Sequence, residues 1–321
     1  MSQLKLTRHP HGISAVDAQY VRPGLAAAHI IQQDGRAAFV DVGTTHSIPH
    51  LLTALDVLGV ARDAVDYILL THVHLDHAGG AGKLLQALPN ARVVLHPRGA
   101  PHLIEPGKLI AGSIAVYGDA LYRQLYGEIV PLPADRVIVT RDLQRIALAG
   151  RELEFVHTPG HALHHHCIVD LSHASIFTGD TFGISYREFD TERGAFIIPT
   201  TTPTQFDPEQ LVASIDRLLA YRPEALYLMH YSRVTDVQRL GESLKSQVRR
   251  LAGIARRHAE GEGRKEAMAA DMRAMWLELL AEHGCTLREE QIDALLETDL
   301  ELNAQGLVAW VDRQKARRGA A

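Results

Sequence analysis

The chain has 321 residues, of which 46% are hydrophobic and 22% charged, which is ordinary for a globular protein with one large core. Its formal net charge of −5 at pH 7 argues against a general nucleic-acid-binding surface, because such a surface needs an excess of basic residues. The sequence contains no run of about 18 apolar residues, so we expect no membrane-spanning helix.

Two features favour a cytoplasmic protein. Cys167 and Cys285 are the only cysteines, so the sequence gives no disulfide framework and fits a reducing compartment. The first residues show no apolar stretch behind a basic start, which a secretory signal would have.

The first hundred residues alternate strand and helix patterns. Residues 13–42 are predicted to form strands, among them 26–31 and 37–42, and further strands are predicted at 67–70 and 92–95. The predicted helices cover residues 48–58 and 83–88. Asp34-Gly35 is typical of a tight hairpin turn, Ser47 of a helix N-cap and Gly59 of a helix end. Repeated alternation of this kind predicts the α/β class.

An insertion at about residues 97–133 interrupts this pattern. Helices are expected near residues 107–117 and 119–127, which carry Tyr117, Tyr122 and Tyr126. Tyrosines at this spacing form either part of the core or a binding wall. An insertion between strands is also a place where an α/β enzyme often carries substrate contacts.

The second half first returns to strands and then becomes helical. Strands are predicted at residues 137–139, 144–148, 152–156, 167–170, 175–177 and 225–229, and helices at 208–221, 236–260, 264–283, 288–297 and 299–318. We therefore predict an α/β domain over residues 1–234 and a helical C-terminal extension over residues 235–321. The extension carries an apolar stripe, which we expect to pack partly on the α/β body and partly against a second subunit, as in a homodimer: Met272, Met275, Trp276, Leu279 and Leu280.

The segment 71–77, Thr-His-Val-His-Leu-Asp-His, places four metal-capable side chains within six residues, directly after an apolar strand. In an extended segment His72 and His74 share a face, so both can point at one spot. His77 breaks this alternation, so a turn must begin before it if its ring is to point inward. Such a turn would divide the cluster into two ligand sets, which suits two metal ions better than one. The alternative is a loop of solvated histidines.

Three further residues follow apolar runs or turns: His161, Asp180 and His230. Imidazole nitrogen and carboxylate oxygen bind zinc at about 2.0–2.2 Å. The full candidate ligand set is His72, His74, Asp76, His77, His161, Asp180 and His230. Two ions about 3.5–4 Å apart can share a hydroxide and lower its pKa.

These residues resemble the signature of the metallo-β-lactamase-fold superfamily. Residues 72–77 match its HxHxDH motif, and Gly160-His161, Gly179-Asp180 and His230 match the later motifs in order and spacing. The resemblance implies a four-layer αβ/βα sandwich. It also implies that His72, His74 and His161 hold one ion, that Asp76, His77 and His230 hold the other, and that Asp180 bridges them. Asp41, at an early strand end, is expected to support the metal loop by hydrogen bonding.

The resemblance further implies a dinuclear metal-dependent hydrolase. Its expected substrate is a small-molecule ester, lactone or thioester, attacked by metal-bound hydroxide, with Asp76 carrying a proton to the leaving group. Zinc is the expected metal, although iron and manganese also suit His/Asp sites. We expect neither a nucleic-acid partner nor a membrane partner. The alternatives are a metal-containing ligand-binding or signalling protein of the same fold and an iron-dependent redox member.

Two departures and several nearby residues bear on this interpretation. His230 lies in Leu-Met-His-Tyr-Ser rather than the Gly-His-Gly context common in the superfamily, and no glutathione-contacting C-terminal pattern of glyoxalase II enzymes is present. His164 and His165 could orient a ligand or be exposed loop residues. Tyr186 could donate a hydrogen bond to an oxyanion or simply pack. An apolar wall for the substrate pocket could be formed by Phe182, Phe196 and Ile198.

Overall fold

The computed structural model describes residues 4–201 and 205–319. The chain divides into two compact units. Unit 1 comprises Met1–His157, His164–Gly179 and Pro223–Val234, and unit 2 comprises Thr158–Leu163, Asp180–Arg222 and Thr235–Ala321. The units are thus interleaved along the sequence and do not follow the predicted boundary after residue 234. That boundary, as the limit of an independently folding part, stays a prediction.

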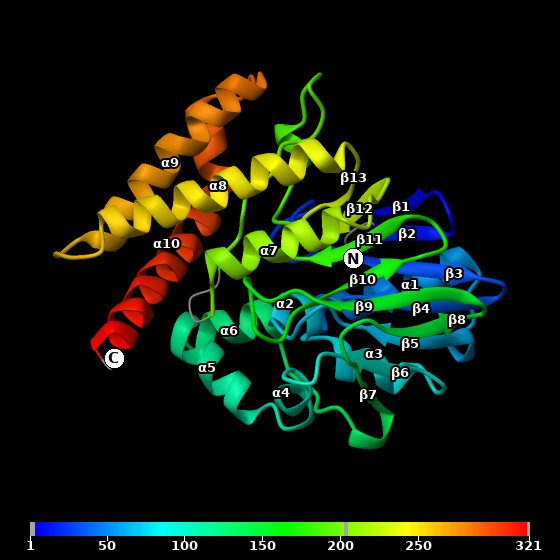
Figure 1. Cartoon of the computed structure of the whole chain (residues 1–321). Helices are drawn as coiled ribbons and strands as arrows, with labels where there is room; N and C mark the ends of the chain where they lie inside the picture. The colour runs from blue at the N-terminus through cyan, green and yellow to red at the C-terminus, as the bar shows by residue number, and fades with distance from the viewer. Residues whose placement is uncertain (1–3, 202–204, 320–321) are drawn as a thin grey trace. The chain divides into compact units, whose positions relative to one another are not determined.

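Unit 1 contains two β-sheets (Figure 1). The first sheet has the order β1 (Leu6–His9), β2 (Ile13–Asp17), β3 (Ala27–Gln33), β4 (Arg36–Val40), β5 (Val65–Leu69), β6 (Arg92–Leu95) and β7 (Val137–Val139). The second has the order β13 (Ser232–Val234), β12 (Ala225–Leu228), β11 (Ser175–Gly179), β10 (His166–Asp170), β9 (Arg151–His157) and β8 (Gln144–Leu148). Strands β4 to β7 are parallel, as are β11 and β12, while the other neighbouring strands are antiparallel.

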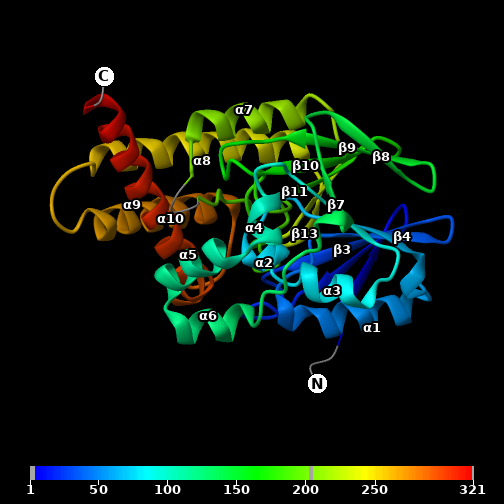
Figure 2. The same cartoon turned by 90° about the horizontal axis from the view of Figure 1, so that it is seen from below.

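The two sheets face each other across a common apolar core. Ile31 and Leu69 of the first sheet pack in one cluster with Phe155, Phe177 and Tyr227 of the second. A second cluster lies on the outer face of the first sheet, where it is covered by α1 (Ile48–Leu58) and α3 (Ala81–Ala87) (Figure 2). Both faces of the first sheet are therefore buried, which explains why its parallel strands read as continuous apolar runs.

The insertion is helical, as predicted. It contains α4 (Ala100–Ile104), α5 (Gly107–Tyr117) and α6 (Asp119–Tyr126). Tyr122 and Tyr126 are buried, whereas Tyr117 is half-buried. The predicted partial-core role is therefore confirmed for two of these tyrosines.

Unit 2 contains α7 (Pro208–Leu219), α8 (Val237–Arg257), α9 (Arg264–His283) and α10 (Glu289–Gly319). Asp207 caps α7 by accepting hydrogen bonds from the backbone N–H groups of Glu209 and Gln210. The prediction of two helices over residues 288–318 was wrong, because α10 is continuous. Charged residues such as Glu297 and Asp299 mimic a break in the apolar pattern, but they do not interrupt helical hydrogen bonding.

The apolar stripe of α9 is buried within unit 2. Met272, Met275, Trp276 and Leu280 are buried, while Leu279 is half-buried. The Trp276 indole N–H donates to Oε1 of Gln247 on α8 at 3.1 Å. The predicted contacts of this stripe with the α/β body and with a second subunit both stay predictions.

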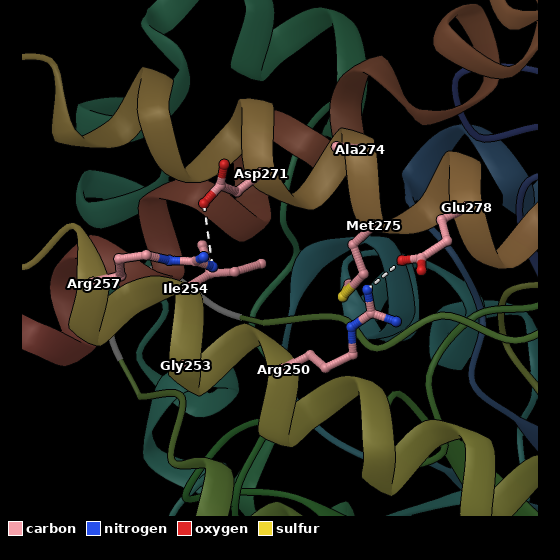
Figure 3. A pocket seen from close by; sticks show the side chains of 8 residues that line it. All are labelled: Arg250, Gly253, Ile254, Arg257, Asp271, Ala274, Met275 and Glu278. Atoms are coloured by element: carbon pink, nitrogen blue, oxygen red, sulfur yellow. Dashed lines mark hydrogen bonds and ion pairs between the residues drawn. The ribbon is translucent and has the colours of Figure 1, made fainter.

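A pocket of about 640 Å³ lies between α8 and α9 (Figure 3). Across it, Arg250 pairs with Glu278 at 2.6 Å and Arg257 with Asp271 at 3.3 Å. Ile254 and Met275 contribute apolar surface. The paired charges join the two helices at its rim.

Local details differ from the sequence prediction at a few places. Ser47 is the N-cap residue of α1, as predicted, but its hydroxyl does not cap α1 and instead accepts from the Thr44 backbone N–H in the preceding 3₁₀ turn, which Thr44 caps. Gly59 ends α1 in the left-handed conformation, as expected. Strands β1 (Leu-Thr-Arg-His) and β13 (Ser-Arg-Val) were not predicted, because both are short and polar and lack the apolar run that marked the other short strands. Among the described residues, no helix combines the length and apolar character needed to cross a membrane.

Candidate metal centre

The metal loop in unit 1 has the turn that the sequence predicted. After β5 the chain stays extended to His74, and the one-turn helix α2 (Leu75–Ala78) then carries Asp76 and His77. Nε2 of His72 lies 2.7 Å from Nδ1 of His74, so the two rings converge on one point. His72 is fully buried and His74 is half-buried, which makes the alternative of solvated loop histidines wrong.

Asp41 holds this loop, as predicted. Its Oδ1 accepts from the Thr71 backbone N–H, and its Oδ2 accepts from the Thr71 hydroxyl, both at 2.8 Å. Oδ2 also lies 2.9 Å from Nδ1 of His77. A carboxylate only accepts, so His77 carries its proton on Nδ1 and presents the lone pair of Nε2 inward.

Asp76, His77 and His230 form a compact triad in unit 1, with ligand atoms all within 4.8 Å of one another. Nδ1 of His230 donates to the Leu25 carbonyl at 2.9 Å, which leaves Nε2 with a lone pair. This Nε2 lies 3.3 Å from Oδ2 of Asp76, and Nε2 of His77 lies 3.6 Å from the same oxygen.

Unit 2 carries a second set with the same pattern. Nδ1 of His161 donates to the Thr200 carbonyl at 3.2 Å, and its Nε2 lies 3.3 Å from Oδ2 of Asp180. Both side chains are buried. His161 and Asp180 thus present a nitrogen lone pair and a carboxylate to each other, as Asp76 and His230 do in unit 1.

The donor chemistry of these sets fits a divalent cation. Three imidazoles are anchored through Nδ1 to an acceptor, and their Nε2 lone pairs face carboxylate oxygens. Two acceptors that face each other in a buried place repel unless a proton or a cation lies between them. Neutral imidazole and carboxylate are also the ligands that zinc and related ions bind.

Gly179, the last residue of β11, is required where it approaches the metal loop. Its φ is +48°, and a Cβ there would lie 2.5 Å from Oγ1 of Thr71 and 2.7 Å from Nε2 of His165. Any larger residue would have to displace the metal loop or the His165 ring. Glycine therefore lets β11 end beside the loop, directly before Asp180.

The neighbouring histidines are buried, so the exposed-loop alternative for His164 and His165 was wrong. The rings of His165 and His72 stack with centroids 4.7 Å apart, and His164 lies edge-on to His74 at 5.4 Å. Both rings therefore pack against candidate ligands. Whether they tune metal binding stays a prediction.

His166 helps to position the metal loop through hydrogen bonds that the sequence did not reveal. Its backbone N–H donates to the Thr71 carbonyl at 2.9 Å, and its Nε2–H donates to the Leu70 carbonyl at 2.8 Å. Its Nδ1 accepts from the Thr140 hydroxyl at 3.1 Å. Burial and the neighbouring His96 lower the pKa of His166 to about 3, so the ring is neutral at physiological pH. The anchoring carbonyls of Leu25 and Thr200 also had no sequence signal, because every residue has a carbonyl.

Tyr186 is buried in unit 2, where its hydroxyl donates to Oδ2 of Asp299 at 3.0 Å. This contact is the one expected for the packing alternative, and the catalytic role stays a prediction. Phe182, Phe196 and Ile198 are likewise buried in unit 2, with Ile198 bridging to Ile184.

The chain is similar in sequence and in structure to known proteins. A sequence profile of the metallo-beta-lactamase superfamily matches residues 21–230, a span that contains all seven candidate ligands. The metallo-beta-lactamase fold-containing protein ST1585 of Sulfurisphaera tokodaii is 29% identical over 224 residues, covering 68% of this chain and 77% of that protein. The crystal structure of ST1585 superposes with a TM-score of 0.60 over 74% of this chain and 86% of that chain.

Two further proteins extend the comparison. The structure of TTHA1429 from Thermus thermophilus, a metallo-beta-lactamase family protein, is 20% identical and covers 98% of this chain and 94% of its own, with a TM-score of 0.63. A hydroxyacylglutathione hydrolase of Aeromonas hydrophila is 30% identical over 203 residues, covering 63% of this chain and 59% of that enzyme. The fold is the predicted αβ/βα sandwich with a helical C-terminal region. From its motifs, its fold and the match over residues 21–230, the chain belongs to the metallo-beta-lactamase superfamily.

Proposed function

We propose that the chain is a metal-dependent hydrolase of a small-molecule ester, lactone or thioester, and that the seven candidate ligands hold two divalent ions. The pairing of the anchored imidazoles of His161, His230 and His77 with a carboxylate oxygen, at 3.3, 3.3 and 3.6 Å, supports this proposal most directly. The order of the motifs supports it independently.

The protein groups have separate roles in this proposal. Asp41 fixes Thr71 and His77, and the Leu25 and Thr200 carbonyls fix the tautomers of His230 and His161. When bound, the ions would supply Lewis acidity and a nucleophile at neutral pH. Asp76 is the residue proposed to carry a proton to the leaving group, because its side chain is 20% exposed, so that a reacting group can reach it.

Zinc is the proposed metal, since the set consists of imidazole and carboxylate ligands in a buried place. Iron and manganese bind the same ligand types. The similarity to a hydroxyacylglutathione hydrolase supports acyl-group hydrolysis. The glutathione-contacting pattern is not present in this sequence, so we propose an acyl substrate of another kind.

A metal analysis and a turnover screen on the same purified sample test the proposal. We expect about two ions per chain and hydrolysis of one or more esters, lactones or thioesters. Activity should disappear after long incubation with a strong chelator and return when zinc is added.

His230→Ala should abolish turnover and lower metal content, while His173→Ala is the matched control outside the ligand set. Full activity in a metal-free, chelated sample would overturn the proposal. Two retained ions without turnover on any substrate class would favour a ligand-binding protein of this fold. Iron with oxygen-dependent colour changes would favour the redox alternative.

A further inference from the structure

A group of tyrosines lies against the metal loop within unit 1. Tyr122 and Tyr126 pack with Leu75, the residue beside Asp76, in one apolar cluster, and Tyr20 and Tyr117 pack against its edge. Three of these tyrosines come from the insertion helices α5 and α6, which lie next to each other in Figures 1 and 2. Tyr20 comes from the loop after β2.

The tyrosines form one connected aromatic group. The hydroxyls of Tyr20 and Tyr126 lie 3.1 Å apart, and their rings stack with centroids 5.9 Å apart. The Tyr117 and Tyr122 rings pack around Tyr126 at 5.7 and 5.6 Å. Tyr126 and Tyr122 are buried, but Tyr20 and Tyr117 remain half-buried. Tyr20 and Tyr117 therefore keep part of their surface exposed at the edge of this aromatic group.

This group is linked to the candidate ligands on two sides. Leu75 connects it to Asp76 through the chain, and the loop that carries Tyr20 also supplies the Leu25 carbonyl that anchors His230. Burial first, and then the Asp76 carboxylate, raise the pKa of Tyr20. Burial also raises the pKa of Tyr117, so both phenols stay protonated and uncharged at neutral pH.

The surroundings of the phenols are apolar and incompletely covered. Ile110, Ile114 and Leu125 are only partly buried where they pack on the tyrosines. Helix α5 has no fully buried residue, although most of its side chains are apolar. A largely apolar helix with this exposure, beside a metal ligand, leaves apolar surface that a ligand could bury.

The geometry points to an acyl-binding wall formed by Tyr20, Tyr117, Ile110 and Ile114, which selects substrates with an apolar acyl chain over acetyl substrates. This inference rests on the proposed hydrolase function and specifies its substrate. The rise from Ile110 to Tyr117 along α5 is about 10 Å, enough for an acyl chain of roughly six to eight carbons. A packed structural cluster with no ligand is the alternative.

The test compares acetyl, butanoyl, hexanoyl and octanoyl esters of one leaving group on the zinc-loaded full chain. Each added methylene should raise kcat/KM about fourfold until the wall is filled. Calorimetric binding of the product carboxylates, acetate to octanoate, gives a second readout that does not depend on turnover.

Ile114→Ala and Tyr117→Ala should lower the octanoyl-to-acetyl ratio of kcat/KM, and the matching ratio of carboxylate affinities, by about tenfold. Tyr20→Phe should retain the chain-length preference. The matched controls are Val57→Ala, an exposed apolar residue of α1, and Tyr67→Phe, a tyrosine of β5, and both should keep the wild-type ratio.

Each outcome decides the question. A wild-type protein that neither hydrolyses nor binds longer chains better than acetyl overturns the inference, as do variants that lose thermal stability while keeping the wild-type ratio. Chain-length-dependent carboxylate binding without any ester hydrolysis would support the wall while contradicting the proposed hydrolase function.

Discussion

At the scale of single residues, three of the candidate ligands are oriented by hydrogen bonds on the ring side opposite the proposed metal. His77, His161 and His230 each use Nδ1 to contact a fixed acceptor, which sets the tautomer and the direction of Nε2. Only one of these acceptors, Asp41, is a side chain. The anchoring is therefore mostly a property of the backbone, and it makes the ring orientations insensitive to most nearby substitutions.

Removing Asp41 should weaken metal binding without removing a ligand. In Asp41→Ala, Thr71 and His77 lose their common acceptor, so zinc affinity should fall by about 10–100-fold, as is typical for a residue that orients a metal ligand. A competitive chelator titration measures this affinity. Asp56→Ala, an exposed carboxylate on α1, is the control and should retain wild-type affinity. Unchanged affinity in Asp41→Ala would show that Asp41 supports only the fold.

Asp180 is proposed to bridge the two ions, because two cations at short distance need a shared anion. Asp180→Ala should therefore lower the metal content from about two ions toward one per chain, with the two-metal geometry lost. Turnover should fall on the order of a hundredfold or more, as when another preorganised charged group is removed. Metal analysis of the purified variant is the measurement, with Asp56→Ala again as the control. Two ions retained at wild-type affinity would contradict the bridging role.

At the scale of elements, one turn of helix organises the loop in unit 1. Helix α2 reverses the direction of the side chains after His74, so that Asp76 and His77 join His230 rather than continuing the extended alternation. In unit 2 the long helices are joined through buried contacts between α8, α9 and α10. Trp276, which is 0% exposed, is the largest of the fully buried side chains in these helices.

Trp276→Ala should reduce the unfolding free energy by about 3–5 kcal/mol, because a large buried side chain is lost and a cavity remains. The Gln247 amide also loses its indole partner. Urea unfolding followed by circular dichroism measures the change. Glu290→Ala, an exposed position at the start of α10, should change it by less than about 0.5 kcal/mol. A small effect at Trp276 would mean that α9 contributes little to the stability of unit 2.

At the scale of the whole molecule, several buried histidines make stability depend on pH. Burial and His9 lower the pKa of His29 to about 3, and burial together with His157 and Arg98 lowers the pKa of His96 to about 4 despite the opposing Asp142. Burial, His96 and His157 likewise lower the pKa of His166 to about 3, against the hydrogen bond to the Leu70 carbonyl. In the unfolded chain these rings titrate near pH 6.5.

The folded protein therefore binds fewer protons than the unfolded chain between about pH 6.5 and pH 3. Stability from the neutral rings is fully present above about pH 6.5 and is lost as the pH falls toward 3. Near pH 5, where the unfolded chain binds about three more protons, the unfolding free energy should fall by about 4 kcal/mol for each unit that the pH is lowered. Urea unfolding of the chelated protein at a series of pH values measures it. His29→Gln should lower the pH dependence of the unfolding free energy by the share of about one proton, while His46→Gln, at an exposed position, should leave it unchanged. A flat profile from pH 8 to 5 would contradict this account.

The sequence by itself determined the α/β class, the HxHxDH loop with its turn, and the family, because local spacing and apolar periodicity encode them. It also indicated that Asp41 would brace the loop. Only the tertiary structure revealed the Leu25 and Thr200 carbonyl anchors, the His166 contact to the metal loop and the tyrosine group beside Asp76. These contacts join residues far apart in the chain through backbone carbonyls or common side chains, which carry no local pattern. The continuity of α10 was missed for a related reason: packing and helical hydrogen bonds, rather than the local charge pattern, decide where a long helix ends.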